Sequence, residues 1–258
     1  MKDIQNIKGD YGYNIEKVGV KNVLQPINIK RVDGGFCNTI GNFNMYVSLN
    51  KNLRGINMSR FLVLLSEYSG EKLDVYSLKN ILEDMKRVMQ SEDSYIDIKA
   101  QFFKEITSPI SNLPGFMNYQ VKFIASLINV EYKNIFEVEV PINTLCPCSK
   151  EISDYSAHNQ RCFVTVKFEA KEKIWIEEII DMIEKTASCK LYPVLKRIDE
   201  KYVTENAYNN PKFVEDIVRD GAKILNEDER ILYFKISSRS EESIHRHDAF
   251  AVIEIDKR

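Results

Sequence analysis

Residues 74–90, DVYSLKNILEDMKRVMQ, decide the fold class of this chain. Their apolar side chains recur at helical spacing: Val75, Leu78, Ile81, Leu82, Met85 and Val88. This spacing gathers them on one face of an amphipathic helix. The segments on both sides of the helix alternate apolar and polar residues instead, which is typical of strands. The sequence therefore predicts helices inserted between runs of strands.

The first half of the chain surrounds this helix with predicted strands. Residues 18–32 and 40–49 are predicted strands, and Asp33-Gly-Gly35 between them is a turn signal. A shorter helix is predicted for residues 59–68, with Ser59 as its N-cap. Three further strand-like runs follow the long helix, at residues 95–107, 117–130 and 135–143.

The second half of the chain repeats this order without repeating its sequence. We predict strands at residues 160–171, 230–238 and 249–256, and helices at residues 175–188, 192–200 and 212–226. Strands that flank helices in this way predict an α+β fold with antiparallel sheets, in which each half has the order ββααββ. We expect an N-terminal arm, residues 1–16, followed by units at residues 17–145 and 146–258. No linker-like segment separates these units, so we expect them to share one core.

Composition is typical of a soluble globular protein. The 258 residues are 44% hydrophobic and 29% charged, and no run approaches the ~18 apolar residues of a membrane span. The N-terminus lacks the apolar segment of a secretion signal, so we expect a cytoplasmic protein. A net charge of −2 argues against a nucleic-acid partner. Five cysteines, an odd number, favour reduced thiols over a disulfide framework.

The three histidines of the chain lie in two short polar motifs. His158 comes twelve residues after Cys146 of the Cys146-Pro-Cys148 motif, and His245 and His247 form a His-x-His pair. Thiolate and imidazole are the ligands that borderline-soft divalent metals prefer. The alternative is two buried structural cysteines beside a hydrogen-bonded histidine. The His pair would point the same way and suit proton transfer, or it is an exposed pair in a loop.

A third metal ligand would have to come from elsewhere in the chain. The stretch between residues 197 and 216 is dense in acids, although any one of them is equally explained as a solvated helix face. Spacing alone therefore leaves both the metal site and its third ligand open.

The motif at residues 144–161, TLCPCSKEISDYSAHNQR, resembles the signature of GTP cyclohydrolase I type B. The resemblance runs through nearly the whole chain. It includes VGVKN at 18–22, FNMYVSL at 43–49, MSRF at 58–61, YPVLKR at 192–197, DEKYVTE at 199–205, NPKFVED at 210–216 and ESIHRHD at 242–248. Several motifs of this length in a fixed order are highly specific.

This resemblance implies a fold, an assembly and a reaction. Members of the family have the tunnelling fold, with two ββααββ units per chain assembled around a barrel, and form homotetramers with active sites at interfaces. They convert GTP and water to 7,8-dihydroneopterin triphosphate and formate, which leads to folate, pterins or deazaguanines such as queuosine. They require a divalent metal, and the ligand chemistry does not decide between zinc, manganese and iron(II).

The resemblance also implies roles for individual residues. Cys146, His158 and Glu200 match the metal ligands of the family. Glu215 matches the glutamate that binds the guanine edge. His245 and His247 match the catalytic histidines of the family. Cys148, in the motif at 144–161, is a further candidate catalytic residue whose role the resemblance does not define. Two positions depart from the family pattern: Asn57 stands where a histidine is common, and Cys162 where a small residue is expected.

The triphosphate of such a substrate requires cations. The candidates are Lys150, Arg161, Lys21, Arg54, Arg60 and Arg239, each of which is otherwise an ordinary surface charge. Two alternatives to the hydrolase remain: the nitrile-reducing enzyme of the same fold, which uses a cysteine and NADPH, and a non-enzymatic purine- or pterin-binding module or structural zinc protein.

Overall fold

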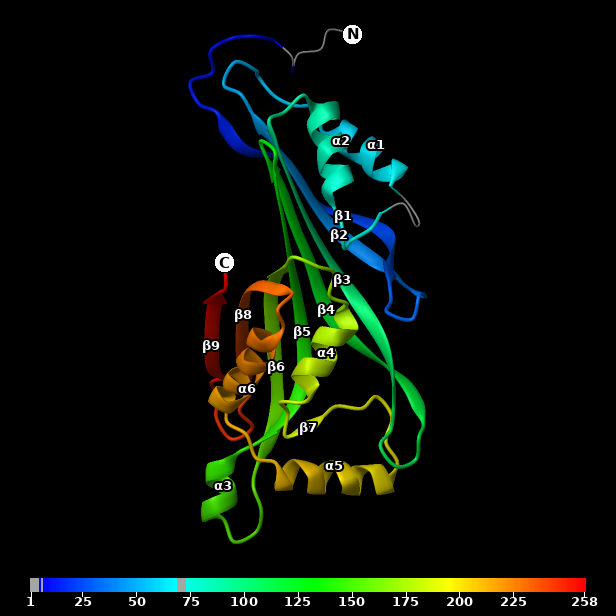
Figure 1. Cartoon of the computed structure of the whole chain (residues 1–258), viewed down its shortest axis with the longest axis vertical. Coiled ribbons are helices and arrows are strands. Elements are labelled where there is room, and N and C mark those ends of the chain that lie inside the picture. The colour runs from blue at the N-terminus through cyan, green and yellow to red at the C-terminus, as the bar shows by residue number, and fades with distance from the viewer. Residues whose placement is uncertain (1–4, 6, 69–72) are drawn as a thin grey trace. The chain divides into compact units, whose positions relative to one another are not determined.

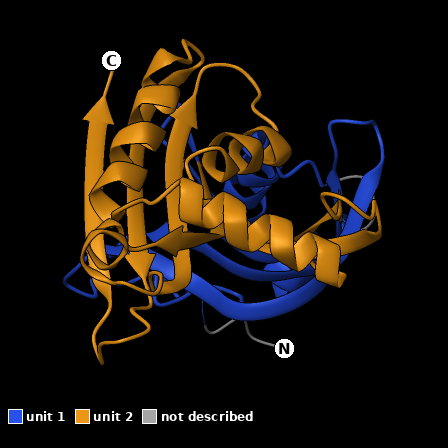
Figure 2. Ribbon diagram, turned by 90° about the horizontal axis from the view of Figure 1, so that it is seen from below, with its two compact units in different colours: residues 1–101, 122–135 blue, residues 102–121, 136–258 orange. Residues whose placement is uncertain are grey.

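This computed structural model describes residue 5, residues 7–68 and residues 73–258. Part of the expected N-terminal arm, residues 1–4 and 6, lies outside the described residues. The chain forms two compact units, coloured separately in Figure 2. Unit 1 comprises residues 1–101 and 122–135, and unit 2 comprises residues 102–121 and 136–258. These units are defined by packing, so the expected division of the repeat at residue 145 stays a prediction.

Unit 1 begins with the antiparallel hairpin of β1 (Ile15–Lys30) and β2 (Phe36–Leu49). The turn predicted at Asp33-Gly-Gly35 is confirmed: Gly34 has a φ of 86°, and the Asp33 carboxylate accepts the Gly35 N–H at 2.8 Å. β3 (Asp93–Thr107) pairs with β2, also antiparallel. From residue 41 to residue 49 every second residue of β2, including Phe43 and Met45, is buried, as alternation predicts.

The helices of unit 1 are α1 (Ser59–Glu67) and α2 (Lys79–Met89), which lie beside each other in Figure 1. The predicted helix over residues 74–90 is correct in its core and wrong at its start. Asp74 instead accepts the Tyr76 N–H at 3.0 Å and pairs with Lys30 at 3.4 Å, so residues before Lys79 form a turn. Ser59 is the first helical residue and not the N-cap, which is Met58.

Unit 2 contains the later strands of the sheet. These are β6 (Asn159–Ala170), β8 (Ile231–Ser240) and β9 (Ala249–Asp256). Two more strands, β4 (Pro114–Ile128) and β5 (Glu131–Leu145), lie partly in unit 2, because residues 122–135 belong to unit 1. Within this unit the strands follow the order β4-β5-β6-β8-β9, and the two-residue β7 (Cys189–Lys190) pairs with β5. The pairs of β5 with β6, β6 with β8 and β8 with β9 are antiparallel. The predicted α+β class with antiparallel sheets is therefore confirmed.

Four helices belong to unit 2: α3 (Pro147–Ile152), α4 (Ile176–Glu184), α5 (Arg197–Asn209) and α6 (Val214–Glu227). α6 packs on β8 and β9 so closely that a Cβ on Gly221 would meet Ile236 at 2.3 Å. The predicted helix at residues 192–200 is wrong, because Pro193 lies in a loop and α5 begins only at Arg197. The short α3 and β7 had no sequence signal. No helix of the described segments is long and apolar enough to span a membrane.

A buried acid of unit 2 gives a pH-dependent contribution to stability. The Glu184 carboxylate, only 6% exposed, accepts the Tyr119 hydroxyl at 2.9 Å and lies 3.8 Å from the Lys190 ammonium. Burial raises the pKa of Glu184, against the opposing effects of the Tyr119 hydrogen bond and of Lys190. The folded state therefore binds this proton more tightly than the unfolded state does.

We expect Glu184→Gln to change how stability depends on pH. The raised pKa of Glu184 contributes stability to the wild type, fully so at pH values below the pKa of Glu184 in the unfolded state. This contribution is lost as the pH rises through the pKa of Glu184 in the folded state. Melting curves from about pH 4 to about pH 7 should therefore show the wild type losing stability relative to the variant. Glu205→Gln, which changes an exposed acid on α5, is the control. Parallel curves for wild type and Glu184→Gln would contradict the prediction.

Candidate functional site

A cavity of about 280 Å³ in unit 2 collects four of the residues singled out in the sequence. They are Cys146, Glu215, His245 and His247. The walls come from the end of β5, the start of β6, the first turn of α6, the end of β8 and the loop that leads to β9. Residues that lie far apart along the chain are thus brought around one space. This cavity is the candidate functional site.

Cys146 lies where β5 ends and α3 begins. It is the N-cap of α3, and its Sγ accepts the Ser149 N–H at 3.5 Å. Pro147 occupies the first helical position, where its missing N–H is tolerated. The Cys146 N–H donates to the His158 carbonyl at 3.1 Å, and the Ser149 hydroxyl accepts the His158 N–H at 3.2 Å. These bonds close the segment on itself and bring Cys146 next to His158.

The ring of His158 is oriented through its Nδ1. That atom lies 2.8 Å from Gln160 Oε1 and 3.3 Å from Ser243 Oγ. Gln160 in turn donates to the Thr144 hydroxyl at 3.3 Å, which fixes its carboxamide. With Nδ1 engaged in this way, Nε2 is the nitrogen suited to bind a metal. Gln160 and Ser243 carried no signal in the sequence, because their role depends on this folded arrangement.

His245 and His247 lie in the loop between β8 and β9. Their rings stack, with centroids 5.0 Å apart and planes 14° from parallel. Arg239 holds the two ends of this loop together, because its guanidinium pairs with Glu241 at 3.0 Å and with Asp248 at 2.9 Å. Both histidines line the cavity, and both are exposed. Arg239, a candidate to bind the triphosphate, is thus already paired with two carboxylates of this loop.

Glu200 lies on the first turn of α5, and its side chain is exposed. Its neighbour Asp199 is fully buried and accepts the N–H groups of Ile110, Ser111 and Lys196, each at 2.9 Å. The Ser111 hydroxyl also donates to it at 2.5 Å. Burial alone would raise the pKa of Asp199, but these hydrogen bonds together hold the pKa below its usual range. Asp199 thereby fixes the start of the helix that carries Glu200.

The donor chemistry of Cys146 and His158 fits a borderline-soft divalent metal. Among residues 7–68 and 73–258, however, no group of three or more His, Cys, Asp or Glu side chains stands ready to hold one. The backbone hydrogen bond between Cys146 and His158 makes these two residues neighbours, and their role as metal ligands stays a prediction. Glu200 as the third ligand remains a prediction.

The remaining predicted residues lie away from this cavity. Cys148 is exposed on α3, and the Lys150 ammonium donates to the Tyr208 carbonyl at 2.6 Å. Arg161 lines a different hollow of about 230 Å³, together with Glu139. Arg161 lies on β6, next to Cys162. The Cys162 thiol is buried, with its Sγ 2.9 Å from the Ser238 hydroxyl oxygen. Burial is the main cause that raises the pKa of Cys162 to about 11. Cys162 is therefore a packing residue.

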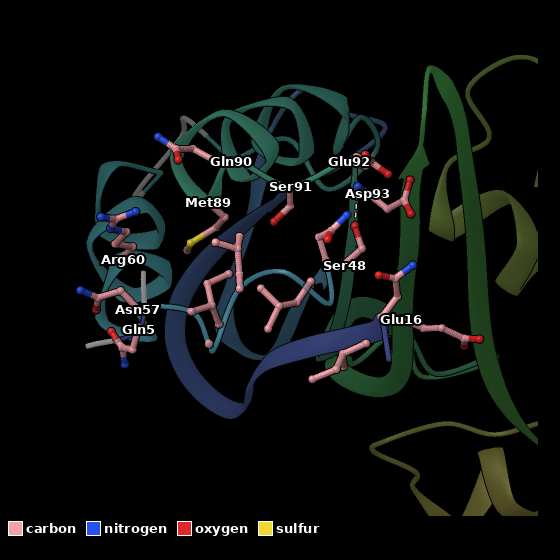
Figure 3. Close-up of a pocket in the computed structure, with 17 residues that line it drawn as sticks. Gln5, Glu16, Ser48, Asn57, Arg60, Met89, Gln90, Ser91, Glu92 and Asp93 are labelled. Carbon is pink, nitrogen blue, oxygen red and sulfur yellow. Dashed lines mark hydrogen bonds between the residues drawn. The ribbon is translucent and has the colours of Figure 1, made fainter. Parts of the chain in front are cut away.

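Unit 1 has a cavity of its own, of about 270 Å³ (Figure 3). Asn57 and Arg60 lie at one side of it, and Glu16 and Asp93 at the other. Arg60 donates to the Val88 carbonyl at 3.3 Å. Because carboxylates outnumber this one arginine among the lining residues, the cavity by itself does not suit a triphosphate.

Comparison with known proteins identifies close relatives. A model of the family "Type I GTP cyclohydrolase folE2" matches residues 1–251. The protein named GTP cyclohydrolase FolE2 of Nitrosococcus oceani is 43% identical over 257 residues, which cover 100% of this chain and 96% of the relative. The protein of the same name of Methylobacillus flagellatus is 45% identical over 258 residues, covering 100% and 97%.

Among solved structures, the uricase of Arthrobacter globiformis is similar in fold. It superposes with a TM-score of 0.61 and covers 93% of each chain, at 7% sequence identity. At this identity the likeness shows the fold alone.

We expect Asp199→Asn to destabilise the protein strongly. In the variant, the amide NH₂ of the asparagine would replace one of the two carboxylate oxygens that accept the surrounding N–H groups. Donors would then face a donor, and at least one buried N–H would lose its acceptor. The melting temperature should fall by roughly 4 °C or more. Asp216→Asn is the matched control. Asp216 also lies in the first turn of a helix, but it is more exposed, accepts the Phe213 N–H at 3.0 Å and pairs with Arg219 at 3.8 Å. Equal shifts for the two variants would refute the special role of Asp199.

Proposed function

The chain belongs to the type I GTP cyclohydrolase folE2 family, and from that premise we propose that it converts GTP and water to 7,8-dihydroneopterin triphosphate and formate. This reaction is the first step of folate and pterin biosynthesis. The observation that carries the proposal is the unit 2 cavity, where Cys146, Glu215 and two histidines surround one space. The family match also favours this activity over the nitrile-reducing enzyme and the binding module.

Glu215 is suited to bind the guanine base. It lies in the first turn of α6, where the helix dipole favours a negative charge. A carboxylate accepts two hydrogen bonds, one from N1–H and one from the 2-amino group of guanine. Adenine offers no such pair of donors. A site built on these two bonds therefore selects guanine strongly.

The stacked pair of His245 and His247 is suited to proton transfer. Imidazole titrates near neutral pH and both donates and accepts protons. Opening of the purine ring requires a proton at N7 and the removal of a proton from the attacking water. Two histidines on one wall of the cavity, held by the loop that Arg239 closes, are placed to serve both steps.

Cys146 and His158 would hold a divalent metal, with Glu200 as the third proposed ligand. When bound there, such a metal supplies Lewis acidity and lowers the pKa of water to about 7. The hydrogen bonds of His158 Nδ1 to Gln160 and Ser243 support this role, because they orient the ring before a metal arrives. Zinc, manganese and iron(II) are the candidate ions.

We further propose a cytoplasmic homotetramer in which the sheets of several chains form the barrel. In such an assembly a second chain would border the cavity. Lys150 and Arg161, which lie outside the cavity of a single chain, would then contact the triphosphate of GTP, and Cys148 would lie near the reacting atoms.

Metal-dependent formate release from GTP tests this function. The protein would be stripped of metal and reloaded separately with zinc, manganese and iron(II), and formate and 7,8-dihydroneopterin triphosphate would be measured. We expect product with at least one metal and its loss, by roughly 1,000-fold or more, in Cys146→Ala. Cys37→Ala, which removes a buried thiol of unit 1, should stay active. Absence of product with every metal, despite intact GTP binding, would overturn the proposal.

The role of Glu215 is tested by Glu215→Gln. Replacing one acceptor oxygen by an amide donor should lower kcat/KM for GTP on the order of 100-fold. Asp216→Asn changes the adjacent acid, which does not line the cavity, and should alter kcat/KM only a few-fold. Steady-state kinetics of both variants decide the point, and an unimpaired Glu215→Gln enzyme would remove Glu215 from the site.

A further inference from the structure

Ser240 lines the candidate cavity and carries an unpaired hydroxyl. Its side chain is fully buried, at 0% exposure, and it lines the cavity together with Glu215 and the histidine pair. Its Oγ has no hydrogen-bond partner among the atoms of the residues that the structure describes. A buried hydroxyl without a partner is costly, so proteins rarely retain one in their interior.

The other buried hydroxyls nearby are satisfied. Ser238, two residues earlier on β8, lies 2.9 Å from the Cys162 Sγ. Ser188 accepts the Leu145 N–H at 3.0 Å, and Thr144 accepts a hydrogen bond from Gln160 at 3.3 Å. Ser240 is therefore the exception on this wall. The difference is its position, because Ser238 does not line the cavity and Ser240 does.

The backbone holds Ser240 firmly in place. It is the last residue of β8, paired with Cys162 of β6 on one side and with Ala249 of β9 on the other. Because alternate side chains of a strand share a face, its Oγ points to the same side as Ser238 and Ile236. The backbone of Ser240 is thus fixed before any ligand enters, and only rotation of the hydroxyl remains for binding a ligand.

We propose that Ser240 is a substrate-positioning residue whose hydroxyl donates a hydrogen bond to an acceptor atom of the guanine base of GTP. This inference rests on the proposed function and extends it. Glu215 can only accept hydrogen bonds, so it binds the donor edge of guanine and leaves the acceptors O6 and N3 unrecognised, while N7 is the proposed site of protonation by the histidine pair. A neutral hydroxyl supplies the donor that this carboxylate lacks. Together the two residues read both kinds of hydrogen-bonding group on the base.

The test compares Ser240→Ala with Ser238→Ala. We expect Ser240→Ala to raise KM for GTP roughly 10-fold with kcat changed less than about 3-fold, the effect of one lost hydrogen bond. Its melting temperature without GTP should stay equal or rise, because an unpaired buried hydroxyl is removed. Ser238→Ala should do the opposite, lowering the melting temperature and leaving KM unchanged. Ser240→Cys, close in size but a weak donor, should fall between wild type and Ser240→Ala.

Equilibrium binding separates this proposal from the proposed function. Calorimetric titration of wild type and Ser240→Ala with GTP measures the hydrogen bond even if no formate is released. Titrations with 3-deaza-GTP and 6-thio-GTP, which alter N3 and O6, then locate the acceptor. The analogue that lacks the bonded atom should bind wild type and Ser240→Ala equally. Equal GTP affinity and equal KM for the wild type and Ser240→Ala would overturn the proposal, whether or not the chain proves to be a cyclohydrolase.

Discussion

The buried carboxylate of Asp199 is the constraint on which the geometry of unit 2 depends. It joins the first turn of α5 to the loop at Ile110 and Ser111, nearly ninety positions earlier in the chain. At the other end of α5, Ala207 packs with Cys189 and with Leu145, the residue directly before Cys146. The Lys212 N–H then donates to the Leu145 carbonyl at 3.1 Å and leads the chain into α6. Fixing α5 at both ends thus places Glu200, Cys146 and Glu215 relative to one another.

The sequence predicted elements whose formation depends on local patterns. Alternation located the strands, and apolar spacing located α4 and α6, because burial of one face is a property of neighbouring residues. The starts of α2 and α5 could not be predicted in the same way. α2 begins later than its apolar pattern predicts, because Asp74 pairs with the distant Lys30. Asp199, in the first turn of α5, accepts hydrogen bonds from residues that lie far away in the sequence. Long-range contacts override a local pattern at both positions.

For the candidate site, too, residues in short local motifs could be identified from the sequence, and residues that depend on long-range contacts could not. The motif with Cys146 and His158 was visible because a short loop holds both residues. The histidine pair and Glu215 line the cavity, and the roles that the family resemblance implies for them stay predictions. Arg161 and Lys150 did not, since strand alternation and a bond to Tyr208 direct them elsewhere. Ser240 had no signal at all, because a serine in a strand becomes unusual only when the fold buries it without a partner.

The segment from Cys146 to His158 closes on itself, which has a consequence for how its residues can move. The ladder of β5 and β6 ends at the pair of Leu145 with Asn159. Beyond this pair, hydrogen bonds among Cys146, Ser149 and His158 hold the segment. The segment can therefore open by loop motion, on a timescale of about nanoseconds to microseconds, while the strands beside it stay paired.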